Sequence, residues 1–306
     1  MPTQRRDRLD GVAIALLVLL CALWGFQQVI VKVAAAQGLP PVLQATLRSI
    51  GATVLSCLWI WWRQGGNGLA RMFRRDETTG PGLLLAAVFG VEFVMLYAGL
   101  NLTSASRSVL FLYTAPFFTA LGAHVFLPEE RLRPMQALGL TIAFAGVAAA
   151  FMDGLLRGHG NLLGDALCGG AALLWGASNV ITKASPGLRH TDASRLLLYQ
   201  IGGSVPVLLL GTVLLGQAAP SPDVTLLAWL GLAYQIVVVA FASYLVWYWL
   251  LLTYPAAKVS SFTFLTPLFG ILGGGLALDE PLSAALLLGL TAIALGLRLI
   301  NRPASA

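Results

Sequence analysis

The sequence contains little charge: of its 306 residues only 10% are Asp, Glu, Lys or Arg, while 58% are hydrophobic. A soluble globular domain carries about 25% charged residues, so this chain lacks the polar surface that water requires. Its net positive charge does not indicate nucleic-acid binding, because the basic residues stand in short loops between apolar runs. The composition therefore indicates a polytopic membrane protein.

Residues for covalent, metal or phosphate chemistry are also scarce. The 3 cysteines lie inside apolar segments and form neither a metal-ligand spacing nor a disulfide framework, and the 3 histidines are scattered. No nucleophile–base set, phosphate-binding loop or metalloprotease spacing is present in the sequence. We therefore expect neither an enzyme nor a protein with a bound metal or cofactor.

Ten apolar segments follow one another along the chain, each near the 20 residues or so that cross about 30 Å of hydrocarbon. They must be helices, because unpaired backbone groups are too costly in lipid, so the predicted class is all-α. No small-residue cleavage site follows the first run, which predicts a retained helix rather than a signal peptide. The predicted spans are 11–36, 40–62, 80–101, 104–127, 133–152, 161–185, 191–216, 224–250, 256–278 and 281–301.

The loops between these segments differ in basic residues, and this difference predicts the orientation. The opposite loops hold only Arg157 clearly outside a helix. Both termini are therefore predicted to be cytoplasmic. The side that they share holds Arg5, Arg6, Arg8, Arg63, Arg71, Arg74, Arg75, Arg131, Arg133, Arg189 and Arg302.

One stretch of the chain occurs twice. Tyr97–Glu129 recurs without a gap as Tyr248–Glu280, at an offset of 248 − 97 = 151, with Tyr, Pro, Gly, Glu and a basic residue in register. The segment Trp24–Lys32 matches Trp175–Lys183 at the same offset. We therefore predict two homologous halves, 1–155 and 156–306. Because five spans per half is an odd number, the second half enters the membrane inverted, as in many secondary transporters that enclose a central cavity.

Polar residues recur on one face of the first helix in each half, at positions i, i+4 and i+8. Polar groups that face lipid are costly, so this face is predicted to turn inward and form a cavity wall. The alternative is contact between helices, with lysines that extend to the membrane edge. The residues are Trp24, Gln28 and Lys32 in the first half, and Trp175, Asn179 and Lys183 in the second.

Glu92 is the one acidic side chain near the middle of a predicted span. It could take up a proton during transport, or pair with Arg48 or Lys32 and hold the bundle together; we favour pairing. Arg48 and Arg107 stand in the outer part of their spans. There they could attract a carboxylate or extend to the membrane surface.

Pro116 and Pro267 occupy matching mid-span positions and should kink their helices, either for gating or as static packing. Glycines stripe the fifth and tenth spans and should allow close helix contact. Aromatic residues are frequent near the predicted interior, where they would form a large, weakly polar cavity suited to amphipathic organic solutes. Those predicted to bind substrate are Tyr97, Phe111, Tyr199, Tyr248 and Phe262, beside Trp24, Gln28, Trp175 and Asn179.

With these motifs, the chain resembles the drug/metabolite transporter superfamily in its ten-helix EamA branch, and within it the inner-membrane YddG-type exporters of aromatic and other amino acids. The resemblance rests on the Trp-Gly of each half, the Tyr…Ala…Pro run of spans four and nine, the acidic residue after them (Glu129, Glu280) and the glycines of spans five and ten. It implies a basket of two inverted five-helix halves, with no cofactor or metal. Proton coupling, suggested for some relatives, would depend here on Glu92.

Three hypotheses follow. The first is an amino-acid exporter of a bacterial-type inner membrane, working by alternating access on a small-molecule substrate. The second is efflux of cationic drugs or another metabolite by the same fold, and the remote third is an intramembrane enzyme or sensor. The lipid bilayer is the expected surrounding, no nucleic acid is expected as a partner, and the oligomeric state stays open, with a monomer possible.

Overall fold

The structure is a computed structural model that describes residues 6, 8–103, 105–152, 156, 161–217, 219–278 and 284–301. Regular structure in this part of the chain is helical throughout. The predicted features at Arg5, Arg157, Glu280 and Arg302 lie outside the described residues.

The first half begins where Asp10 caps α1, its carboxylate accepting the backbone N–H of Ala13 at 2.9 Å. The second helix continues past the predicted end at residue 62, because Gly65, with φ of 69°, bends the chain without ending it. The fourth span is broken in two. The elements of this half are α1 (Gly11–Ala36), α2 (Pro41–Met72), α3 (Thr79–Leu102), α4 (Ala105–Leu112), α5 (Ala115–Phe126), the 3-10 turn η1 (Pro128–Glu130) and α6 (Pro134–Ala150).

The second half repeats this order with more irregular helices. Its seventh and eighth spans each contain a π-helical segment, and its ninth span contains a 3-10 turn. The elements are α8 (Leu162–Ala184), α9 (Pro186–Arg189), α10 (Ala193–Leu197), η2 (Leu198–Gly202), α11 (Gly203–Leu214), α12 (Leu226–Tyr234), η3 (Gln235–Ser243), α13 (Tyr244–Thr253), α14 (Ala256–Ser261), η4 (Phe262–Leu265), α15 (Thr266–Leu278) and α16 (Ala284–Ile300).

Helices long and apolar enough to cross a membrane dominate both halves. Six described helices meet this condition by length and composition, and three further apolar helices are shorter. In addition, α8 has 23 residues and carries Asp165, Asn179 and Lys183. The membrane-spanning all-α fold with two repeats is therefore confirmed.

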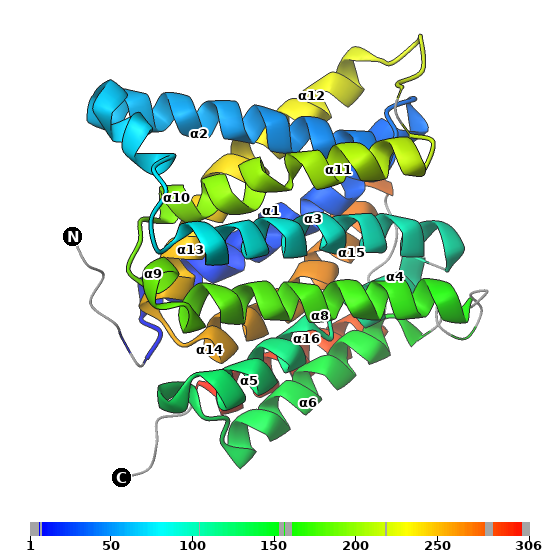
Figure 1. The fold of residues 1–306 in the computed structure, drawn as a ribbon. Helices are drawn as coiled ribbons and strands as arrows, with labels where there is room; N and C mark the ends of the chain where they lie inside the picture. The colour runs from blue at the N-terminus through cyan, green and yellow to red at the C-terminus, as the bar shows by residue number, and fades with distance from the viewer. Residues whose placement is uncertain are drawn as a thin grey trace.

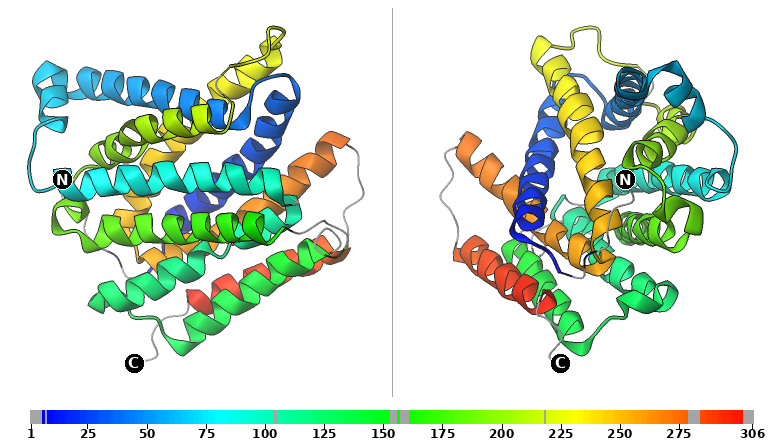
Figure 2. Two further views of the ribbon diagram at one scale, coloured as in Figure 1. Left: turned by 45° about the vertical axis from the view of Figure 1, so that its right-hand side comes forward. Right: turned by 90° about the vertical axis from the view of Figure 1, so that its left-hand side faces the viewer.

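The packing of the helices repeats between the halves (Figures 1 and 2). Helix α1 packs against α15, and α8 packs in the same way against α5. The glycine after each repeated tryptophan makes this approach possible. A Cβ atom on Gly25 would stand 2.7 Å from Cβ of Phe269, and one on Gly176 would stand 2.6 Å from Cβ of Phe118. The two contacts are 151 residues apart on both sides (176 − 25 and 269 − 118), so they are equivalent. The glycine of each Trp-Gly motif therefore allows close contact between two helices, α1 with α15 and α8 with α5.

Helices α6 and α16 lie side by side along one edge of the bundle (Figure 2). Their glycines face each other's backbone. A Cβ atom on Gly139 would meet the carbonyl oxygen of Gly296 at 2.7 Å, and one on Gly146 would meet that of Gly289 at 2.7 Å. The predicted glycine stripes are thus a contact between the fifth and tenth spans within the chain.

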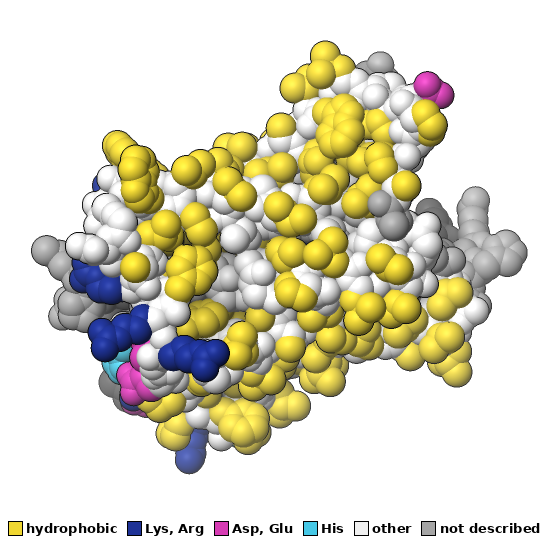
Figure 3. All heavy atoms as spheres, turned by 45° about the horizontal axis from the view of Figure 1, so that its top comes forward, with side chains coloured by type: hydrophobic (Ala, Val, Ile, Leu, Met, Phe, Trp, Pro, Cys, Tyr) yellow, Lys and Arg dark blue, Asp and Glu magenta, His cyan; other side chains and the backbone are white. Residues whose placement is uncertain are grey.

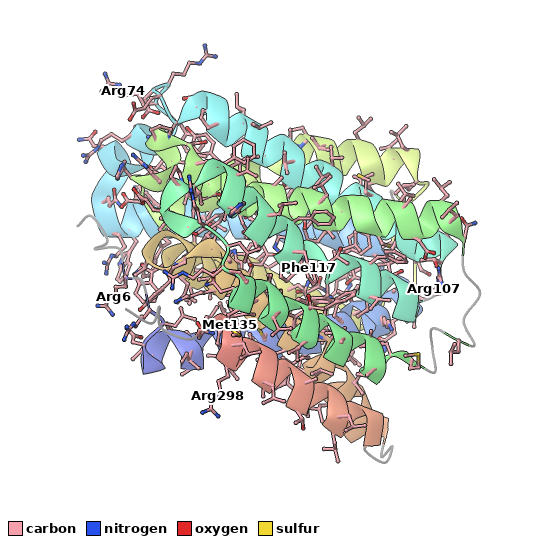
Figure 4. The ribbon with its side chains drawn as sticks, turned by 90° about the horizontal axis from the view of Figure 1, so that it is seen from below. Arg6, Arg74, Arg107, Phe117, Met135 and Arg298 are labelled. Carbon is pink, nitrogen blue, oxygen red and sulfur yellow. The ribbon has the colours of Figure 1, made fainter. Side chains whose placement is uncertain are left out.

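Hydrophobic and charged side chains occupy different parts of the surface. Hydrophobic side chains cover the body of the bundle, whereas most charged side chains in view gather at one end (Figure 3). Arg6, Arg74 and Arg298 mark this end and Arg107 marks the opposite one (Figure 4). We call them the basic end and the opposite end. The apolar body is suited to lipid and the two ends to water.

Candidate substrate-binding site

A basic and an acidic side chain are enclosed in the middle of the bundle. Arg48 of α2 is fully buried, with 0% of its surface exposed, and Glu92 of α3 is 5% exposed. The two interact electrostatically. Nevertheless, Nε and Nη2 of Arg48 and Oε2 of Glu92 have no hydrogen-bond partner among the described residues. At about 1.5 Å per residue, Glu92 lies roughly 20 Å from the start of α3, which is mid-depth in a membrane. Polar atoms left unsatisfied there are costly, so the site favours a polar ligand or water.

Tyrosine hydroxyls of both halves and an amide of the second half lie near these two side chains. Arg48 interacts electrostatically with Tyr97 and Tyr244, and Glu92 with Tyr244 and Tyr248. The hydroxyl of Tyr248 donates a hydrogen bond to Oε1 of Gln200. The cluster therefore joins α2 and α3 of the first half to η2 and α13 of the second.

Aromatic rings form a continuous wall beside the charges. The Trp24 ring lies 5.9 Å from the Tyr244 ring, which lies 6.3 Å from that of Phe89. The Phe93 ring follows at 4.7 Å from Phe89. The guanidinium carbon of Arg48 stands 4.7 Å from the centre of that Phe93 ring, which is cation–π contact. An apolar side chain would find a matching surface here.

The indole of Trp24 is held in place by its own polar atom. Nε1 donates to Oγ of Ser243 at 2.8 Å. Because Ser243 ends the π-helical segment η3, this bond ties α1 to an irregular part of the eighth span.

The helices that carry the two prolines are broken rather than smoothly bent. Pro116 stands in the first turn of α5, directly after the break that follows α4. Pro267 stands in the first turn of α15, directly after the 3-10 turn η4. Proline fits a first turn because the amide hydrogen it lacks has no partner there. Both spans change helix type or break next to the proline, whereas the predicted kinks and their role in gating stay predictions.

A buried ion pair joins the two halves at the basic end. Nζ of Lys183 lies 2.5 Å from Oε1 of Glu130 and donates to the carbonyl oxygen of Tyr254 at 2.6 Å. The other carboxylate oxygen of Glu130 accepts the backbone N–H of Ala256 at 2.6 Å. Glu130 thus holds the start of α14, and the ion pair links α8 of the second half to the 3-10 turn η1 of the first half at the basic end.

At the opposite end, the lysine that matches Lys183 in the repeat is not buried in an ion pair. Lys32 is the repeat mate of Lys183, yet it is exposed, and so is Gln28. Arg107 forms an ion pair with Asp165, which also accepts the hydroxyl of Thr103 at 2.8 Å. Of the two lysines in matching positions, one is therefore buried in a pair and the other reaches the surface.

The remaining predicted residues are spread through the interior. Asn179 is buried and donates to Oγ1 of Thr119 at 3.3 Å, and the Trp175 ring lies 6.0 Å from that of Tyr113. Phe111 is half-buried. Phe262 is buried with its carbonyl oxygen 3.1 Å from Sγ of Cys21.

Tyr199 belongs to a separate cluster at the basic end, where its hydroxyl lies 2.8 Å from Oγ1 of Thr78. The hydroxyl of Thr78 donates to Asp76 at 2.6 Å, and Arg195 donates to the same carboxylate at 2.6 Å. The Thr78 hydrogen bonds, followed by that of Arg195, hold the pKa of Asp76 at about 2. Tyr199 therefore does not reach the central charges through any described contact.

The structure brings Trp24, Arg48, Glu92, Tyr97 and Tyr248 together, and it does not bring Lys32 to Glu92. Sequence reasoning missed Gln200 and gave no role to Glu130. Both had a signal: Gln200 precedes the matched Ile201, and Glu130 follows the matched Glu129.

Two matched halves of apolar helices, with charges and aromatic rings enclosed between them, define the protein as a membrane transport protein. The model of the EamA-like transporter family matches residues 11–152 and 162–302. The chain belongs to this family.

Relatives are similar over nearly the whole length. A protein of Escherichia coli (strain K12) named "Probable amino-acid metabolite efflux pump" is 29% identical over 95% of this chain and 94% of its own length. One of Bacillus subtilis (strain 168) named "Uncharacterized transporter YvbV" is 29% identical over 95% and 92%. A crystal structure with 18% sequence identity superposes with a TM-score of 0.76, covering 95% of this chain and 99% of the other, which shows the fold.

Proposed function

We propose that this transporter exports amino acids, with neutral and aromatic ones favoured. The observation that carries the proposal is the enclosed pair of opposite charges, Arg48 and Glu92, each with unpaired polar atoms. An amino acid offers the complementary groups. Its carboxylate suits the planar fork of a guanidinium, and its ammonium group suits a carboxylate.

The aromatic wall supports a preference for apolar side chains. A substrate whose ends meet Arg48 and Glu92 would lay its side chain along the Phe89 and Phe93 rings toward Trp24. The curated relative named as an amino-acid metabolite efflux pump supports the same class of cargo.

Alternating access is the mechanism that we propose. The two halves are equivalent in packing but not in their lysines, since Lys183 is buried in an ion pair at the basic end while Lys32 is exposed at the opposite end. If Lys32 became buried at the opposite end while Lys183 left its ion pair, the opposite end would close and the basic end would open. The excess of arginine at the basic end favours a cytoplasmic location for that end and for both termini, in a bacterial-type inner membrane.

The test is counterflow in liposomes that contain the purified protein and an unlabelled amino acid. We expect saturable entry of labelled phenylalanine, competed by other neutral amino acids. Phenethylamine, which lacks the carboxylate, and phenylacetate, which lacks the ammonium group, should compete weakly. No saturable flux of any labelled amino acid would refute the proposal, and competition by amines and cationic drugs alone would favour cation efflux.

A matched pair of variants tests whether Arg48 binds the carboxylate of the substrate. Arg48→Gln should lower the affinity of the protein for phenylalanine about 10- to 100-fold, because a hydrogen bond to a charged group contributes about 1.5–3 kcal/mol. Arg75→Gln makes the same charge change at an exposed position of the basic end and should leave transport unchanged.

A further inference from the structure

A cavity opens at the basic end, and neither Arg48 nor Glu92 lines it. It has a volume of about 540 Å³ and lies between the end of α2, the turn from α9 to α10, and α13. Trp59 and Arg63 line it from α2, Arg189 and His190 from the turn, and Trp249 from α13. The cavity therefore has walls from both halves.

Its charge is positive. The Arg63 guanidinium carbon stands 5.3 Å from the centre of the Trp59 ring, and Nε of Arg189 donates to Nε2 of His190 at 3.1 Å. Asp192 also lines the cavity, but among the described residues it forms no ion pair with either arginine. Two guanidinium groups against one carboxylate make the cavity positive, and both arginines are exposed to an incoming anion.

The surroundings place this cavity at the boundary between lipid and water. Tryptophans gather where α2 leaves the apolar body: Trp59 is 38% exposed, Trp61 57% and Trp62 69%. Tryptophan prefers the headgroup level of a bilayer. Shortly beyond them Gly65 bends the helix and the chain becomes polar. One flank of the cavity is thus aromatic and adjoins lipid, while the other flank is polar.

We propose that this cavity binds the headgroup of an anionic phospholipid. A phosphodiester supplies the negative charge that Arg63 and Arg189 lack among the described residues, and guanidinium groups bind phosphate oxygens in a bidentate way. The attached glycerol and acyl chains would leave along the exposed tryptophans into the bilayer. Basic pockets between membrane helices at the cytoplasmic face bind such headgroups. Because Arg63 and Arg189 come from different halves, the bound lipid would stabilise the arrangement of the two halves that brings these residues to one cavity.

The experiment measures the thermal unfolding of the purified protein in detergent as lipid is added. Phosphatidylglycerol should raise the unfolding temperature in a saturable manner, and phosphatidylcholine should not. In Arg63→Gln and in Arg189→Gln the half-saturating concentration should rise about fivefold, since an arginine near the membrane surface contributes about 1 kcal/mol to attraction of anionic lipid. Arg75→Gln, an exposed arginine outside the cavity, should respond like the unmodified protein.

Three results would overturn the proposal. Equal shifts with phosphatidylcholine would mean that the charge of the headgroup is not recognised. Equal responses of Arg63→Gln and Arg75→Gln would mean that the cavity is not the site. The same shift with inorganic phosphate or glycerol phosphate alone would identify a site for a soluble anion instead of a lipid.

Discussion

If the ion pair between Lys183 and Glu130 holds the basic end closed, as the proposed mechanism requires, its removal has an effect whose size can be calculated. The two side chains are only 7% and 2% exposed, so water screens their attraction little. Replacement of one partner removes the compensation that this ion pair gives to the other buried charge. Such a loss costs about 3–5 kcal/mol for a buried pair. Because about 1.4 kcal/mol corresponds to a factor of ten, the closed arrangement should lose about 100-fold to several thousand-fold of its population relative to an open one.

Ala257 offers a reporter for this change. It is 6% exposed on α14, next to the backbone N–H that Glu130 accepts. In a chain whose native cysteines are replaced by alanine, Ala257→Cys should react slowly with a thiol reagent in nanodiscs. Adding Lys183→Met or Glu130→Gln should raise the labelling rate about 100-fold or more, up to the rate of an unprotected cysteine.

The double variant provides the decisive comparison. With Lys183→Met and Glu130→Gln together, both charges of this pair are removed, and glutamine keeps an oxygen for the N–H of Ala256, so most of the protection should return. Arg131→Met removes an exposed charge next to Glu130 and should not affect labelling. If the single variants label as slowly as the parent, or if their effects simply add in the double variant, the pair does not hold the basic end closed.

Three further predictions follow from other contacts. Trp24→Phe and Ser243→Ala each remove the same hydrogen bond, so each should lower stability by about 0.5–1.5 kcal/mol in denaturant unfolding and the pair should be non-additive; full additivity would contradict the coupling. Gly146→Leu places a side chain against the carbonyl oxygen of Gly289 and should destabilise the protein by about 1–3 kcal/mol in thermal unfolding, with Gly146→Ala less affected. The folded pKa of Asp76, about 2, lies below the ordinary 3.8, so the stability that its ionised carboxylate contributes is complete above pH 3.8 and is lost as pH falls toward 2. The Asp76→Asn variant should therefore be less stable than the parent at neutral pH, and its stability should change less between pH 3.8 and pH 2.

The sequence by itself determined the class, the number of spans and the repeat. Apolar runs of sufficient length can only be helices in lipid, so most described helices begin and end close to the predicted spans, although α2 continues to Met72. Matching residues at a fixed offset identified the two halves, and glycine and proline indicated the close helix contact and the interrupted fourth and ninth spans. These features are local, since each depends on the residue type and on its neighbours along the chain.

Only the tertiary structure decided which polar residues meet. Helical spacing placed Trp24, Gln28 and Lys32 on one face, but the packing buries Trp24 and exposes the other two. Arg48 had two possible environments in the sequence, and the fold encloses it beside Glu92. Likewise, the repeat made Lys32 and Lys183 equivalent, while packing gave them different surroundings. The physical reason is that burial and charge pairing depend on groups far apart in the chain, which a one-dimensional pattern does not relate.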